Sequence, residues 1–192
     1  MKKKLKLGVL VSGNGSNLEA ILKACQKPSF PARVVVVISN NPEAFALQRA
    51  RKYGIPTVVV AKNNEAEILA ALKKSKVDLV CLAGFMKMLS AGFIKKYRHR
   101  IINIHPSLLP SFPGLHAQRQ ALEHGVKITG ATVHFVDAGC DTGPIILQGA
   151  VPVLENDTLE KLKRRILKVE HKIYIEGLKV IGRRVIKTGR KK

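Results

Sequence analysis

Val34-Val-Val-Val-Ile38 is a run of five consecutive apolar, β-branched residues, and runs of this kind decide the fold. A strand with one face in water alternates apolar and polar side chains, whereas a strand covered on both faces is continuously apolar. Similar apolar segments occur at Leu5 to Val11, Arg33 to Ile38, Thr57 to Val60 and Val77 to Leu82. The sequence therefore predicts central strands of a parallel sheet.

Helix-like segments separate these apolar runs. They lie at Asn17 to Cys25, Glu43 to Tyr53 and Glu65 to Lys74. Alternating strands and helices are typical of βαβ units, which place helices on both faces of a parallel sheet. We therefore predict an α/β fold with a Rossmann-like, doubly wound and mostly parallel sheet.

The second half of the chain predicts a different strand arrangement. A strand at Arg100 to His105 is followed by a loop rich in Pro and Ser and by a short helix around Ala117 to His124. Two further strands, Thr129 to Val136 and Ile145 to Val153, could pair antiparallel across a Gly-rich loop. The sheet should therefore end in an antiparallel C-terminal portion.

A long helix is expected to close the chain. Asp157 is a suitable N-cap for it. Its apolar stripe comprises Leu159, Leu162, Ile166, Val169 and Ile173. With 192 residues the chain suits one domain. We predict a single domain over residues 1–182 and a flexible basic tail over 183–192.

The charge of the chain is strongly positive. Lys and Arg number 34 against 13 Asp and Glu, giving a formal net charge of +21, which is a feature of many nucleic-acid binders. However, the basic residues are spread along the chain, and only 5% of residues are aromatic, so few side chains could stack on bases. A solvated lysine-rich surface, with a general attraction for phosphorylated or polycarboxylate substrates, is favoured over nucleic-acid binding.

Two further classes are disfavoured by composition. The sequence contains no apolar run of the eighteen or more residues that span a membrane. Cys25, Cys81 and Cys140 are widely spaced and form no Cys-x-x-Cys pair, which indicates neither a disulfide framework nor a zinc site. A cytoplasmic location fits this pattern best.

Asn103 and His105 form a candidate catalytic pair. They lie two positions apart at the end of a predicted strand, so they share a face and project from the edge where open α/β sheets bind ligands. Pro106 ends the strand immediately afterwards. Taken alone, an Asn-x-His of this kind is more often an ordinary strand end than a catalytic site.

A glycine-rich loop, Gly13-Asn14-Gly15-Ser16-Asn17, joins the first predicted strand to the first predicted helix. Backbone N–H groups in such a loop can converge on an anion. The motif alone fits equally well an ordinary tight turn with Ser16 or Asn17 as the helix cap. Position 18 is Leu rather than the third glycine of a dinucleotide fingerprint, which disfavours NAD.

Together these motifs resemble the formyltransferases that use 10-formyltetrahydrofolate, and within them the glycinamide ribonucleotide formyltransferases. The likeness runs from about Leu7 to about Leu178. It includes the residues Ser12-Gly-Asn-Gly-Ser-Asn-Leu18, Leu82-Ala-Gly-Phe-Met86, Asn103-Ile-His-Pro-Ser-Leu-Leu-Pro110, His116-Ala-Gln-Arg-Gln-Ala-Leu122, Asp141-Thr-Gly-Pro144 and Glu170-His171.

The resemblance implies that the formyl group of 10-formyltetrahydrofolate passes to the amine of 5-phosphoribosylglycinamide in the third step of purine synthesis. The folate is a co-substrate, both substrates are small molecules, and no metal is implied. The alternatives are a relative with another acceptor, such as water, a sugar nucleotide or methionyl-tRNA, or an inactive basic module that binds nucleic acid. The sequence does not decide between a monomer and a homodimer.

The resemblance also implies catalytic roles. Asn103 and His105 would donate hydrogen bonds to the negative oxygen of a tetrahedral intermediate, and Asp141 would stabilise a protonated His105 and assist proton transfer. Without the resemblance, Asp141 reads as a plain turn residue. Supporting positions are His116, Thr132 and His134. A metal site built from the histidines and an Asp lacks the usual ligand spacing.

Binding roles follow from the same resemblance. The ribonucleotide would be bound by Gly13, Asn14, Gly15, Ser16, Asn17, Lys62, Met86 and Glu170, with Lys62 replacing a family arginine. The folate would be bound by Leu82, Lys87, Met88, Leu89, Ile94, Asn103, Val136, Cys140 and Asp141. Lys87 stands where family members commonly carry arginine.

Overall fold

Strands and helices alternate along the chain as the sequence predicts. The structure is a computed structural model that describes residues 4–61 and 64–188, with side chains up to Arg183. Its elements are β1 (Leu5–Val11), α1 (Ser16–Cys25), β2 (Ala32–Ser39), α2 (Phe45–Lys52), β3 (Thr57–Val59), α3 (Glu65–Lys74), β4 (Leu79–Leu82), α4 (Ala91–Lys96), β5 (Ile101–His105), α5 (Ala117–Glu123), β6 (Ile128–Phe135), β7 (Ile145–Pro152) and α6 (Leu159–Thr188).

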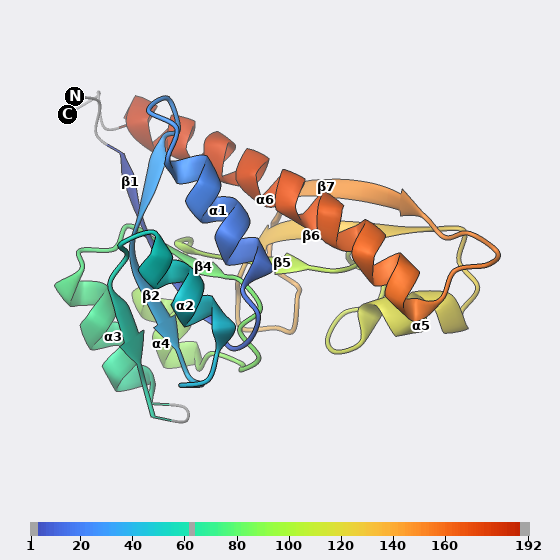
Figure 1. Cartoon of the computed structure of the whole chain (residues 1–192), viewed down its shortest axis with the longest axis horizontal. Coiled ribbons are helices and arrows are strands. Elements are labelled where there is room, and N and C mark those ends of the chain that lie inside the picture. The colour runs from blue at the N-terminus through green and yellow to red at the C-terminus, as the bar shows by residue number, and fades with distance from the viewer. Residues whose placement is uncertain (1–3, 62–63, 189–192) are drawn as a thin grey trace.

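The strands form one seven-stranded sheet in the order β3-β2-β1-β4-β5-β6-β7 (Figure 1). Strands β1 to β5 are parallel to one another, whereas β6 pairs antiparallel with both β5 and β7. The predicted α/β fold, with its antiparallel C-terminal portion and long closing helix, is therefore confirmed. No helix within residues 4–61 and 64–188 is long and apolar enough to cross a membrane.

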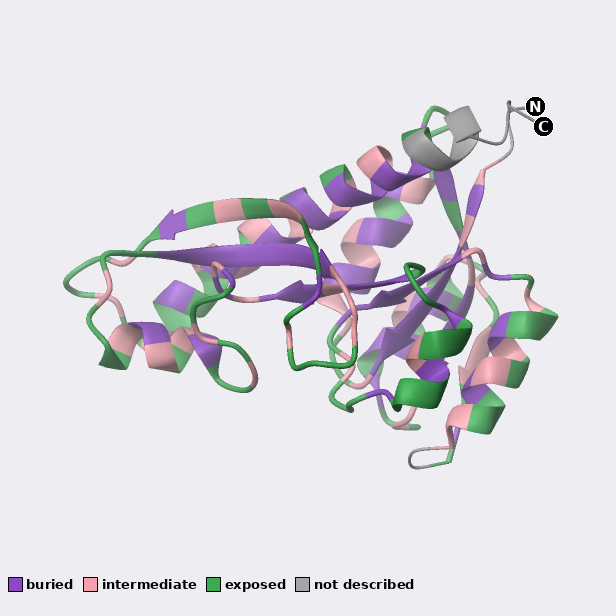
Figure 2. Ribbon diagram, turned by 180° about the vertical axis from the view of Figure 1, so that it is seen from behind, coloured by how far each residue is buried: buried purple, intermediate pink, exposed green. Residues whose placement is uncertain are grey.

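Two hydrophobic clusters cover the two faces of the sheet, which explains why its central strands are continuously apolar. In β1, Leu7 and Val9 pack into the cluster that contains α1, α2 and α6, whereas Leu10 packs into the cluster that contains α3 and α4. Neighbouring side chains of a strand point to opposite faces, so both sets must be apolar. Figure 2 shows the resulting buried residues along the strands.

The parallel strands deliver their following loops to one edge of the sheet. The register places Leu10 of β1 beside Leu82 of β4, and Leu82 beside Asn103 of β5. Strand order reverses between β1 and β4, the kind of position where open α/β sheets bind ligands. Hydrogen bonds from Ser12 N to Gly84 O (3.0 Å) and from Met86 N to Ser12 Oγ (3.0 Å) join the loops after β1 and β4.

The start of α6 differs from the prediction. The helix begins at Leu159, and the Thr158 hydroxyl accepts a hydrogen bond from Lys161 N (3.3 Å), so the assignment of Asp157 as N-cap is wrong. Asp157 instead accepts two hydrogen bonds from the Arg165 guanidinium, at 2.6 and 2.8 Å. The bidentate geometry of Arg favours this pairing over a cap.

The predicted boundary after residue 182 does not coincide with the end of a helix. The backbone of α6 continues to Thr188, and so includes part of the predicted basic tail. Residues 189–192 lie outside the described residues. The flexibility of this tail stays a prediction.

Tyr174 ties α6 to the centre of the sheet. Its side chain is fully buried, and its hydroxyl donates to the carbonyl oxygen of Leu82 at 2.9 Å. The carbonyl oxygen of Ile102 lies 3.5 Å away. A buried hydroxyl needs such a partner, so the helix is held against the end of β4 and the start of β5.

We expect Tyr174→Phe to lower the free energy of unfolding by about 1–2 kcal/mol, because it leaves a buried carbonyl without its donor. Urea denaturation measures the change. Tyr97→Phe is the control, since Tyr97 is also buried but no hydrogen bond of its hydroxyl occurs among the described residues, and it should change the free energy by less than about 0.5 kcal/mol. Equal losses in the two variants would contradict the role given to the Tyr174 hydroxyl.

Candidate active site

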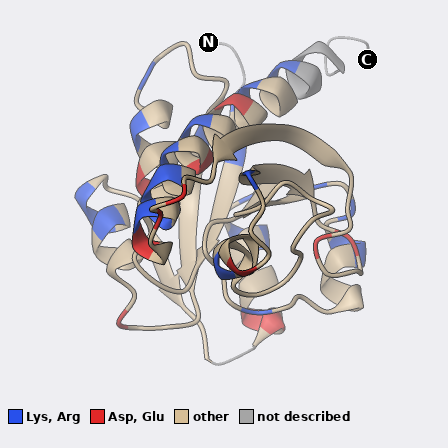
Figure 3. Ribbon diagram, turned by 90° about the vertical axis from the view of Figure 1, so that its right-hand side faces the viewer, with Lys and Arg blue, Asp and Glu red and all other residues tan. Residues whose placement is uncertain are grey.

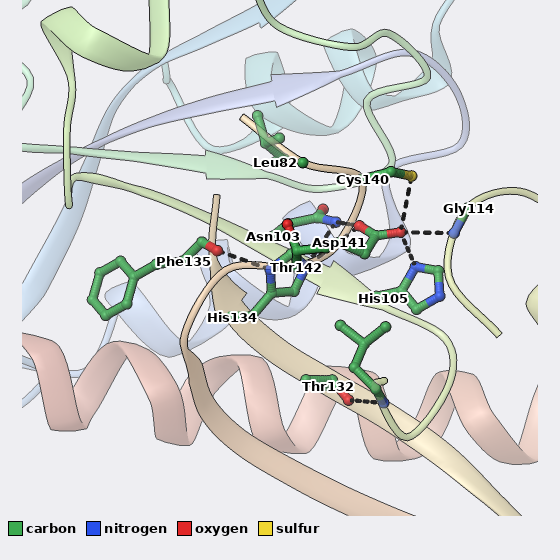
Figure 4. Close-up of polar contacts among 12 residues, drawn as sticks. Leu82, Asn103, His105, Gly114, Thr132, His134, Phe135, Cys140, Asp141 and Thr142 are labelled. Atoms are coloured by element: carbon green, nitrogen blue, oxygen red, sulfur yellow. Dashed lines mark hydrogen bonds and ion pairs between the residues drawn. The ribbon is translucent and has the colours of Figure 1, made fainter. Parts of the chain in front are cut away.

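The predicted catalytic residues meet at the carboxyl end of β5 (Figure 4). Asn103 and His105 lie on one face of β5, and the antiparallel register sets them opposite His134 and Thr132 of β6. Asp141 belongs to the loop between β6 and β7, which returns the chain over these side chains. The structure thus brings Asn103, His105 and Asp141 together from segments distant in sequence.

Several donors surround the carboxylate of Asp141. Its Oδ2 accepts a hydrogen bond from Gly114 N at 2.9 Å and lies 3.1 Å from His105 Nδ1. Its Oδ1 lies 3.4 Å from Asn103 Nδ2 and 3.5 Å from His134 Nε2. The backbone of Asp141 adopts the left-handed conformation, with φ of 57°, which directs the side chain into the site.

This environment favours the charged carboxylate. Burial alone would raise the pKa of Asp141, but the hydrogen bonds from His134 and Gly114 and the charges of His105 and His134 outweigh it and lower the pKa to about 2. A negative charge is therefore fixed beside the imidazole of His105.

His105 is buried, and both of its ring nitrogens face oxygen acceptors. Nδ1 faces the carboxylate of Asp141 at 3.1 Å, and Nε2 lies 2.8 Å from the carbonyl oxygen of Phe112. A neutral imidazole carries only one N–H, so only the imidazolium donates to both oxygens. Each ring nitrogen of His105 therefore has an oxygen acceptor within hydrogen-bond distance.

The three predicted supporting residues are placed differently. His134 reaches Asp141, as given above. Thr132 Oγ1 instead donates to Ser107 O (2.7 Å) and accepts from Leu109 N (3.1 Å), so it fixes the loop that follows His105. His116 is exposed, and among the described residues none of its hydrogen bonds or ion pairs reaches Asp141. Asp141 Oδ2 instead accepts a hydrogen bond from Gly114 N, two residues before His116.

The glycine-rich loop leaves the start of α1 open. Gly15 is the N-cap residue, in the left-handed conformation with φ of 75°, and no side chain caps the helix. The alternative in which Ser16 or Asn17 forms the cap is therefore not found. A Cβ atom on Gly15 would lie 2.5 Å from Ala46 Cβ, so the loop packs too tightly on α2 for any other residue. The free N–H groups of α1 are available to an anion.

Asn17 and Glu170 form a buried polar pair beside this loop. Asn17 Nδ2 donates to Glu170 Oε2 at 2.7 Å, which joins α1 to α6. Burial raises the pKa of Glu170, and the Asn17 hydrogen bond partly offsets this. Asn17 Oδ1 is buried without a hydrogen-bond partner among the described residues. This pair can therefore make a further polar contact. Lys62, also predicted to bind the ribonucleotide, lies outside the described residues.

Arg49 also organises the loop, and sequence reasoning missed it. Its guanidinium donates to the main-chain oxygen of Asn14 and to Asn14 Oδ1, both at 2.9 Å. It also pairs with Glu19 and lies 4.8 Å from the ring centroid of Phe45. No local sequence signal identifies this contact, because it forms only when α2 packs beside α1.

The predicted folate-binding residues share one region. Four of them, Leu82, Leu89, Ile94 and Val136, belong to one hydrophobic cluster. The loop after β4 also carries the largely exposed Met86 and Met88, with 69% and 70% of their surface accessible. Lys87 and Cys140 are exposed, and Cys140 Sγ lies 3.8 Å from Asp141 Oδ2. Uncovered apolar side chains next to polar catalytic groups are typical of a ligand site.

Among residues 4–61 and 64–183, no group of three or more His, Cys, Asp or Glu side chains is arranged to hold a metal ion. The three cysteines are free thiols. The hydrogen-bond donors and the carboxylate of this site can stabilise a negative oxygen and take part in proton transfer.

Comparisons with known proteins agree with this geometry. The chain is 41% identical to phosphoribosylglycinamide formyltransferase of Bacillus subtilis, over 91% of this chain and 93% of that protein. It is 48% identical to the trifunctional purine biosynthetic protein adenosine-3 of Drosophila melanogaster, but spans only 14% of its length. A crystal structure of phosphoribosylglycinamide formyltransferase from Anaplasma phagocytophilum matches with a TM-score of 0.92 and 52% identity, over 94% of this chain and 88% of that one.

The family described as formyl transferase matches residues 5–178. This range includes β1, the glycine-rich loop, the β5 strand with Asn103 and His105, and the segment of α6 that carries Glu170. The match thus covers every part of the site described above, and the chain belongs to the formyl transferase family.

Proposed function

We propose that this chain transfers the formyl group of 10-formyltetrahydrofolate to the amine of 5-phosphoribosylglycinamide, a step of purine synthesis. The observation that carries the proposal is the convergence of Asn103, His105 and Asp141 on the sheet edge that also bears the open N-terminus of α1. Relatives named as phosphoribosylglycinamide formyltransferases support the same conclusion.

The proposed site suits direct attack of an amine on a formyl carbon. The amine nitrogen bonds to the formyl carbon, and the carbonyl oxygen becomes negatively charged in the tetrahedral intermediate. Asn103 Nδ2 and the His105 imidazolium are the donors for this oxygen. In the structure His105 Nε2 lies 2.8 Å from Phe112 O, so the formyl oxygen would replace that carbonyl beside Nε2.

Collapse of the intermediate breaks the bond between the formyl carbon and N10 of the folate. The attacking amine must lose a proton and N10 must gain one, directly or through water. Asp141 is ionised at neutral pH and lies beside both donors, so its charge stabilises the positive charge that forms on the attacking amine, while a water molecule carries the proton from the amine to N10. No metal is required for this sequence of steps.

Substrate contacts are proposed on both sides of this centre. Residues Gly13 to Asn17 bind the monophosphate of the ribonucleotide, and Glu170 and Met86 contact its ribose or glycinamide portion. The folate lies along Leu82, Leu89, Ile94 and Val136, with Lys87, Met88 and Cys140 at its border. We propose a single domain over residues 1–182 that acts on small molecules in the cytoplasm, where free thiols are stable.

A single assay tests the reaction. The protein is mixed with a 10-formylfolate donor and phosphoribosylglycinamide, and deformylation of the folate is followed spectrophotometrically. Turnover that depends on phosphoribosylglycinamide supports the proposal. Equal turnover with water alone would identify a hydrolase instead, and absence of turnover together with salt-sensitive binding to nucleic acid would indicate an inactive binding module.

Replacing Asn103, His105 or Asp141 individually by Ala should lower kcat by about 100-fold or more, since each change removes a donor or charge that acts on the intermediate. Steady-state kinetics gives kcat, and urea unfolding monitors the fold. His99→Asn is the control, because His99 is exposed, no side-chain hydrogen bond or ion pair of it occurs among the described residues, and Asn tolerates its left-handed backbone. A near-wild-type rate for His105→Ala would rule out the proposed mechanism.

The low pKa of Asp141 makes a pH-dependent contribution to stability. Because the pKa is lowered from 3.8 to about 2, the ionised carboxylate stabilises the folded state above pH 4, and this stabilisation is lost as the pH falls from about 4 to 2. Asp141→Asn should therefore be less stable than the wild type at pH 6, with a difference that narrows over that range. Urea unfolding at several pH values measures it, and a difference independent of pH would contradict the assignment.

Arg49→Met should raise the KM for phosphoribosylglycinamide by about ten-fold with little change in kcat. The change removes the two charge-assisted hydrogen bonds to Asn14, so the glycine-rich loop proposed to bind the phosphate becomes less ordered. Arg49→Lys should restore the affinity only in part, since an ammonium cannot reproduce the bidentate contact. Arg51→Met, an exposed position of the same helix, serves as control. A loss confined to kcat would place the role of Arg49 elsewhere.

A further inference from the structure

The solvent-facing side of α6 carries a stripe of basic residues, which we call the α6 stripe. It consists of Lys161, Arg164, Lys168, Lys172, Lys179 and Arg183. With 3.6 residues per turn, these positions fall within about 100° of the helix circumference, and with a rise of 1.5 Å per residue they extend over roughly 33 Å. Figure 3 shows the Lys and Arg segments of α6 in blue along the length of the helix.

Little negative charge compensates the α6 stripe. Lys179 pairs with Glu176 at 2.7 Å, whereas the other five cations have no ion pair with any carboxylate in residues 4–61 and 64–183. The remaining basic residues of this part of α6 behave differently, since Lys163 pairs with Glu160 and Arg165 with Asp157. Ion pairs therefore neutralise the basic residues beside the α6 stripe, whereas most positive charges within the stripe are not neutralised.

The opposite side of α6 is fully used by the fold. Leu162, Ile166, Tyr174 and Leu178 are completely buried against the sheet and α1. A helix that binds a membrane surface must insert an apolar face between lipids. Because the apolar face of α6 is already covered, a lipid surface is a poor partner, and the stripe fits a polyanion that needs charge alone.

We propose that the α6 stripe binds the phosphate backbone of a nucleic-acid duplex, an interaction separate from formyl transfer. A duplex offers a regular row of phosphates, and its helical turn of about 34 Å is close to the length of the stripe. With 5% aromatic residues the chain has few side chains for stacking on unpaired bases, which favours a duplex and contact with its backbone. Basic residues that are separated in the sequence thus lie on one side of α6.

The test measures binding of the full chain to a 20-base-pair DNA duplex of arbitrary sequence by fluorescence anisotropy at several salt concentrations. Five uncompensated cations predict a slope of about −4.5 for the logarithm of affinity against the logarithm of salt concentration. In Lys168→Glu/Lys172→Glu the magnitude of the slope should fall by about 2, and affinity at about 0.1 M salt should fall at least ten-fold.

The matched control is Lys73→Glu/Lys74→Glu, which makes the same change in net charge at the end of α3. Both double variants should retain the wild-type urea midpoint and formyl transfer rate. Weaker binding in the α6 variant alone supports the proposal. Equal losses in both variants, no binding at 50 mM salt, or tighter binding to phosphatidylserine vesicles than to the duplex would each overturn it.

Discussion

The pairing of a partly buried carboxylate with a buried imidazole is the interaction on which the site depends. Burial opposes the charge of Asp141, so the fold must supply donors from β5, from β6 and from the loop that contains Gly114. Each donor fixes one segment relative to the others. The β5–β6 register, the loop after His105 and the β6–β7 loop are thus positioned by one electrostatic requirement.

The closing helix has a structural task that matches this arrangement. Through Glu170 it reaches the start of α1, and through Tyr174 it reaches the end of β4 and the start of β5. One helix therefore connects the glycine-rich loop to the centre of the sheet, next to the strand that carries Asn103 and His105. Formation of the site is coupled to packing of the C-terminal third of the chain, although the reacting groups lie on strands and loops far from it in sequence.

The fold was predictable from the sequence because its central strands are apolar on both faces and its helices are apolar on one. Asn103, His105 and Asp141 could be selected because family motifs mark them, although their mutual contacts needed the β5–β6 register. Three details were not predictable: the Asp157 bond to Arg165, the exposed position of His116 and the contact of Arg49 with Asn14. Each depends on tertiary packing, which local spacing does not encode.

The glycine-rich loop, Gly13 to Asn17, is proposed to bind an anion mainly through main-chain N–H groups. At Gly15 it packs against Ala46 with no room for a side chain. A substitution at Gly15 would therefore require a backbone shift, which the neighbouring helix resists. Under the proposed function, evolution towards a new acceptor would therefore be constrained at Gly15, in the loop proposed to bind the phosphate. Sequence changes that alter the acceptor should instead accumulate around Met86 and Glu170, because these proposed contacts to the rest of the substrate are made by side chains.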